Sequence, residues 1–140
     1  MKHLNKYVNK RFSILKSNLK KYKNKPKPEQ LHQVRVELKK VKTIFKLLAC
    51  NSKQFSFSSS YKPLKHIFKK AGHIREWDVL HQLFEHYKLQ EFEENIIPSP
   101  KERKSEITKF HKKTKQYILT VKQIHKKTKG FFKKVNKQDL

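Results

Sequence analysis

The sequence predicts an all-α fold, a single four-helix bundle. Its 140 residues contain only two glycines, which disfavours turn-rich β architectures. Over four long stretches the apolar residues recur every three or four positions, as they do on the buried face of an α-helix. The length suits one hydrophobic core, so residues 1–140 are expected to form one helical domain.

The first helix is predicted over residues 2–22 and the second over about residues 29–49. Two prolines, Pro26 and Pro28, separate them, because a helix interior rejects proline. The apolar positions of the first helix are Leu4, Tyr7, Val8, Phe12, Leu15, Leu19 and Tyr22. Those of the second are Leu31, Val34, Leu38, Val41, Ile44, Phe45 and Leu48.

A serine-rich stretch, residues 51–60, has no helical period and predicts a loop. The third helix should therefore begin near Tyr61 or Lys62, with Pro63 in its first turn. Its early inner face contains Leu64, Ile67, Phe68, Ala71 and Ile74. Past Gly72 the apolar stripe changes sides, to Trp77, Leu80, Phe84 and Tyr87. That change leaves Arg75 and Asp78 at i, i+3 spacing, where they are expected to pair.

Residues 88–98 contain three glutamates and read as an acidic linker before a fourth helix. Ser99, Pro100 and Glu102 match a capping box with proline at the first helical position. The core stripe of this helix is Ile107, Phe110, Thr114, Tyr117, Ile118, Val121 and Ile124. The helix either ends at Gly130 or bends there toward Phe131 and Phe132.

Charge is the strongest compositional signal, because 36 basic and 11 acidic residues give a net charge of +25. Such an excess favours a polyanionic partner, which would be nucleic acid, polyphosphate or an acidic membrane surface. Only four of the basic residues are arginine, at positions 11, 35, 75 and 103. An array of lysines suits repetitive phosphate without base reading, although a genome rich in A and T would also favour lysine.

The sequence also predicts the cellular compartment of the protein. Cys50 is the only cysteine, which excludes a disulfide within the chain, and neither a secretion signal nor a membrane-spanning apolar run is visible. We therefore expect no membrane insertion and a location in the reducing cytoplasm.

Two cationic edges are predicted beside the core faces of the second and third helices. The first edge spans an arc of about 80° at 3.6 residues per turn and the second an arc of about 100°. The members of the first edge are His32, Arg35, Lys39, Lys42 and Lys46. Those of the second are Lys62, Lys65, His66, Lys69 and His73.

Two motifs coincide with these edges. Residues 32–42 read H-x-x-R-x-x-x-K-K-x-K, and residues 71–80 read A-G-H-I-R-E-W-D-V-L. Together they resemble the CHAD domain, whose hallmarks are H-x-x-R followed by a basic R-R-x-R cluster, and a downstream L-G-x-x-R-D-x-D-V. This chain departs from that pattern with lysines at 39, 40 and 42, Ala71 for leucine and Glu76 for aspartate.

The resemblance implies a domain that binds inorganic polyphosphate without catalysis or cofactor, built from two four-helix bundles of which this chain contains one. Polyphosphate granules would then be a location to examine. The resemblance carries over His32, Arg35, Lys39, Lys40, Lys42 and Arg75 as binding residues. The cationic edges add Lys46, Lys62, Lys65 and Lys69. Lys40 is the exception to the geometry, because it points about 80° to the far side of His32.

Two other functions stay open, namely a non-specific RNA- or DNA-binding protein and a structural assembly protein. Two chains could also form a homodimer that restores the missing bundle, with Trp77, Phe131 and Phe132 as candidate apolar contacts. Catalytic and metal-binding patterns are weak. His81, Glu85 and His86 lack the spacing of known zinc motifs, so no metal is expected.

Overall fold

The computed structural model describes the backbone of residues 2–138 and the side chains of residues 2–135, and this part of the chain is helical without a β-strand. The described residues form five α-helices, which are α1 (Lys2–Asn24), α2 (Pro28–Asn51), α3 (Phe57–His86), α4 (Glu93–Ile96) and α5 (Pro100–Gln138). A 3-10 turn, Gln90–Phe92, precedes α4. The all-α prediction is confirmed, but the described residues hold a fifth, very short helix within the acidic linker.

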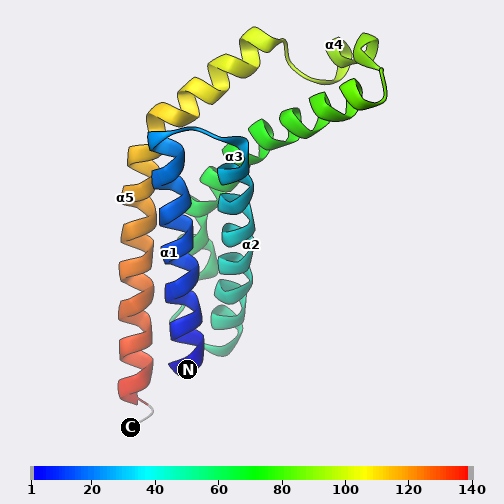
Figure 1. Cartoon of the computed structure of the whole chain (residues 1–140). Helices are drawn as coiled ribbons and strands as arrows, with labels where there is room; N and C mark the ends of the chain where they lie inside the picture. Colours follow the sequence, from blue (N-terminus) through cyan, green and yellow to red (C-terminus); the bar gives the residue numbers. More distant parts are fainter. Residues whose placement is uncertain (1, 139–140) are drawn as a thin grey trace.

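The long helices pack around one core. α1 lies against α2 and α5, and α3 lies against the same two helices from the other side (Figure 1). Phe12, Phe45 and Phe132 are fully buried in this core, together with leucines and valines from the first three helices. Burying one such side chain contributes roughly 1.5–3 kcal/mol, so these apolar stripes supply most of the driving force for the bundle.

The end of α3, the linker and the beginning of α5 extend beyond the other helices, as Figure 1 shows in green and yellow. We call residues 76–106 the arm. Leu89 N–H donates to the Phe84 carbonyl where the chain leaves α3, and Lys88 adopts a positive φ of 54° at this turn. α5 then returns to the bundle beside α1.

Helix α3 begins at Phe57, four residues before the predicted start, and the predicted loop is correspondingly shorter. Ser56 caps the helix, because its Oγ accepts a hydrogen bond from Ser59 N–H at 3.4 Å. Pro63 consequently lies inside the helix instead of in its first turn. The carbonyl of Ser59, which Pro63 cannot engage, belongs to an exposed residue where water can reach it.

Helix α5 begins as predicted, with Glu102 N–H donating to Ser99 Oγ at 3.2 Å. It does not end at Gly130 but continues to Gln138, and Phe132 beyond the glycine is fully buried and extends the apolar stripe. The buried stripe also includes His125 and Thr128, which the apolar pattern did not indicate. Ile107, predicted as core, is 38% exposed because it lies where α5 leaves the bundle.

Tyr7 and Tyr87 were expected on the apolar stripes of their helices, and both expectations are wrong. Tyr7 is exposed, with the Arg11 guanidinium over its ring, and Tyr87 is exposed at the end of the arm. Phe132 belongs to the core, while Phe131 and Trp77 pack against it in part. These last three side chains therefore do not form the exposed apolar patch that was expected to support a homodimer.

Candidate functional site

The cationic edge of α2 lies along the seam between α2 and α3. Three of its cations lie over aromatic rings of α3, with centroid distances of 4.7 Å for Arg35 and Phe68, 5.7 Å for Lys42 and Tyr61, and 5.8 Å for Lys46 and Phe57. The order along α2 is the reverse of the order along α3, because the two helices run antiparallel. The electron-rich ring faces hold these cations along one line.

The sequence did not reveal this role for the aromatic rings. Phe68 was expected only as a core residue, and Phe57 fell in the stretch that was expected to be a loop. The available signal was the spacing of Phe57, Tyr61 and Phe68, which places all three rings on one side of α3 once the helix is known to begin at residue 57.

The cations of the seam are not neutralised by acidic side chains. Among the described residues no ion pair involves a member of the α2 edge, nor does any involve Lys62, Lys65 or Lys69 on α3. Their positive charges therefore add to one another along the seam. Such a surface attracts anions and can replace their counterions.

Arg35 is the most constrained member of the edge. Its Nε is buried and has no hydrogen-bond partner in the described part of the chain. The guanidinium packs against Gly72, where a Cβ atom would lie 3.3 Å from Nε. Gly72 therefore leaves the space that this guanidinium occupies between α2 and α3.

A surface groove begins at Arg35 and follows α3. Its lining includes Arg35, Phe68, Lys69, Gly72 and Arg75, together with the acidic Glu76. The fold thus brings Arg35 of α2 close to Lys69 and Arg75 of α3, although both lie far from Arg35 in the sequence. Lys62 and Lys65 lie on exposed positions earlier along α3, and Lys39 and Lys46 on exposed positions of α2.

Three other predicted residues lie differently. Lys40 points away from the seam, and its Nζ lies 3.6 Å from Oε1 of Glu37, a buried carboxylate that also accepts a hydrogen bond from Arg11 at 3.1 Å. Arg75 lines the groove but pairs with Asp78 at 3.1 Å, as expected. His32 is half-buried one turn before Arg35 and does not line this groove.

Both motifs of the seam lie within a longer match. The chain matches the family model of the CHAD domain over residues 6–126. It belongs to the CHAD domain family. Comparison with curated proteins and with solved structures found no match. In this CHAD domain the glycine of the second motif is Gly72, which contacts the arginine of the first.

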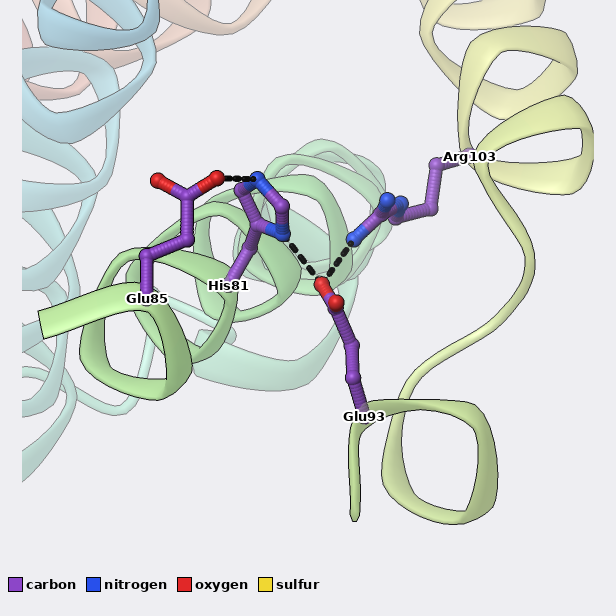
Figure 2. A network of polar contacts seen from close by, with 4 residues as sticks. All are labelled: His81, Glu85, Glu93 and Arg103. Carbon is purple, nitrogen blue, oxygen red and sulfur yellow. Dashed lines mark hydrogen bonds and ion pairs between the residues drawn. The ribbon is translucent and has the colours of Figure 1, made fainter. Parts of the chain in front are cut away.

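The arm of the CHAD domain contains a separate polar network (Figure 2). His81 of α3 pairs with Glu85 through Nε2 at 2.9 Å and with Glu93 of α4 through Nδ1, and Arg103 of α5 donates to Glu93 at 3.2 Å. The hydrogen bond between His81 and Glu93 raises the pKa of His81 and lowers that of Glu93. This network joins three helices.

In the sequence, His81 with Glu85 and His86 formed only a weak pattern for a metal site. In the described part of the CHAD domain no three His, Cys, Asp or Glu side chains are arranged to hold a metal ion. Over the same residues, no helix is long and apolar enough to cross a membrane.

Proposed function

We propose that this CHAD domain binds inorganic polyphosphate along the α2–α3 seam and that it catalyses no reaction on it. The observation that carries the proposal is the line of cations without acidic partners on α2 and α3. Polyphosphate presents repeated negative charges and no bases, so it can be held by successive lysine side chains and by the guanidinium of Arg35 through charge-assisted hydrogen bonds.

The seam also supports polyphosphate over single-stranded RNA in this proposal. Proteins that bind single strands stack bases on exposed aromatic rings. In the seam, Phe57, Tyr61 and Phe68 instead carry cations over their faces. RNA would therefore be held by its phosphates alone, which supports polyphosphate as the preferred ligand.

A competition experiment tests this proposal. Labelled long-chain polyphosphate is bound to the CHAD domain at physiological salt and challenged with single-stranded RNA at the same total phosphate concentration, and then the order is reversed. We expect polyphosphate to displace RNA and RNA to displace little polyphosphate. Displacement in the opposite sense would support the RNA-binding alternative, and binding of neither would support the structural-assembly alternative.

The absence of catalysis is tested in the same samples. Phosphate release and shortening of the polymer are measured after long incubation with and without added divalent cations. We expect the chain length of polyphosphate to stay unchanged. Shortening that depends on the protein would contradict the non-enzymatic part of the proposal.

Polyphosphate granules in the cytoplasm are where we expect such a binder to be located.

A further inference from the structure

A second cavity lies where the arm leaves the bundle, beside the loop between α1 and α2 (Figure 1). Its walls come from the end of α1, this loop, the start of α2, α3 and the first turns of α5. Of its described lining residues, only Arg75 also lines the groove that begins at Arg35. The cavity has a volume of about 320 Å³. Proteins bind small organic molecules in pockets of roughly 300–1,000 Å³, so this cavity has the size of such a site.

The walls of this cavity are mainly apolar and aromatic. Tyr22 of α1, Leu31 of α2 and Ile74 of α3 belong to the buried core and also line the cavity. Trp77 of α3 packs only in part against the core, and Ile107 of α5 is 38% exposed. Because α3 and α5 diverge at this point, they leave these walls open to a ligand. Covering apolar walls is favourable, and aromatic walls favour a ligand with a flat ring.

The cavity also carries one positive charge that the described chain does not neutralise. Its lining includes four basic side chains, which are Lys27, Arg75, His81 and Arg103. The last three make ion pairs, and Asp78, the acidic residue of the lining, is the partner of Arg75. Among the described residues no acidic side chain pairs with Lys27. A ligand that complements this lining therefore has one negative charge.

Lys27 is held in place by its neighbours in the chain. It lies between Pro26 and Pro28, whose rings fix their own φ angles. Its backbone N–H donates to Gln30 Oε1 at 2.9 Å, and its carbonyl accepts a hydrogen bond from Gln30 N–H at 3.1 Å. The backbone that carries this charge is thus positioned before a ligand binds, which reduces the entropy lost on binding.

From these features we infer that the cavity binds a small aromatic molecule with a single acidic group, such as an aromatic carboxylate. The ring of the ligand contacts the apolar walls, including Trp77, and its acidic group pairs with Lys27. A polyanion would find no further unpaired cation on these walls, and a neutral ring would leave Lys27 without a partner. The inference does not rest on the binding of polyphosphate.

The first test uses two fluorescent dyes with the same ring system, anilinonaphthalene sulfonate and phenylnaphthylamine, of which only the first has an acidic group. Each is titrated into the full chain without polyphosphate. Trp77 is the only tryptophan of the sequence, so a dye in this cavity quenches its fluorescence and receives its energy. We expect both dyes to bind, the sulfonate at least about threefold more tightly, as a partly exposed ion pair allows.

Lys27→Gln tests the charge. It should lower the affinity for the sulfonate dye to that for the neutral dye, whose own affinity should not change. The matched control is Lys25→Gln, which removes an exposed lysine of the same loop outside the cavity lining and should alter neither affinity. Equal weakening of the sulfonate dye by both substitutions would show diffuse attraction by the basic surface and would refute the role of Lys27.

Ile107→Glu tests the apolar wall. Both dyes should bind at least about tenfold more weakly, because a charged group replaces an apolar contact. The control is Leu119→Glu, which changes a residue of α5 that is 45% exposed and lies outside the lining. It should leave both affinities unchanged, and circular dichroism verifies that each variant is folded. Equal effects of the two substitutions would place the dyes elsewhere on the protein.

Competition tests the class of ligand. Naphthoate and decanoate, an aromatic and a linear carboxylate, are each added to the complex with the sulfonate dye. We expect naphthoate to displace the dye at the lower concentration. Displacement by decanoate alone would overturn the aromatic class, and a wild-type chain that binds neither dye would overturn the inference as a whole.

Discussion

The guanidinium carbon of Arg35 on α2 lies 4.7 Å from the centre of the Phe68 ring on α3. The ring and Gly72 confine the side chain from two directions, and no acidic residue of the described chain pairs with it. A cation held in this way needs little reorganisation to receive an anion.

Charge reversal should separate the seam from the rest of the basic surface. We compare Arg35→Glu/Lys39→Glu with Lys115→Glu/Lys126→Glu, whose two lysines are exposed on α5. The two variants lose the same net charge. If the seam is the site, the first should weaken polyphosphate binding at least about tenfold more than the second, measured by titration calorimetry. Equal losses would mean diffuse attraction by the whole surface. Lys39→Glu/Lys42→Glu repeats the test without altering Arg35, in case its reversal unfolds the chain.

Salt should weaken binding in a defined way. The logarithm of the affinity for polyphosphate is expected to fall linearly with the logarithm of the salt concentration, with a slope that corresponds to roughly four to eight displaced counterions. Fluorescence titrations between low and physiological salt measure this slope. An affinity that does not change with salt would contradict binding through lysine and phosphate.

Gly72→Ala should weaken polyphosphate binding without lowering the stability of the fold. Alanine is favoured over glycine inside a helix by about 1 kcal/mol, but its Cβ would lie 3.3 Å from Arg35 Nε, so the guanidinium must shift slightly to make room. We expect unchanged or higher thermal stability together with weaker polyphosphate binding. Gly130→Ala is the control, because nothing lies within 4 Å of a Cβ there. It should raise stability and leave binding unchanged. Unaltered binding in Gly72→Ala would show that Gly72 does not serve the site.

His125 should make the fold sensitive to acid. It is buried against Phe12, accepts a hydrogen bond from Lys16 at Nδ1 and donates one to Asn9 from Nε2. Burial, reinforced by the charge of Lys16, lowers its pKa to about 4. The unfolded chain therefore takes up this proton first as the pH falls.

The stabilising effect of neutral His125 should be complete above pH ~6.5 and diminish between pH ~6.5 and ~4. His81, whose pKa is raised, acts in the opposite sense, because its proton stabilises the folded state at low pH. In His125→Gln the free energy of unfolding should therefore fall less over this range. Urea unfolding at successive pH values measures the free energy of unfolding of the wild type and of His125→Gln. Identical pH profiles for the variant and the wild type would contradict the role of His125.

The sequence determined the class of fold and most of the core. Apolar spacing of three and four positions survives in any amphipathic helix, so α1, α2 and most of α5 could be placed from it within a few residues. The two motifs were sufficient to indicate the family, and the pairing of Arg75 with Asp78 followed from spacing within one helix. These features depend on residues close in the chain, where helical geometry fixes the distances.

Tertiary structure decided what depends on contacts between helices. Only the packing of α2 on α3 shows that Phe57, Tyr61 and Phe68 lie beneath the cations, or that Gly72 makes room for Arg35. Helical periodicity cannot say how far α5 continues, because Phe132 is buried by other helices and not by its own. The arm is likewise a tertiary feature. Its apolar residues have helical spacing like those of the core, and they are exposed because α3 and α5 diverge from the bundle at that point.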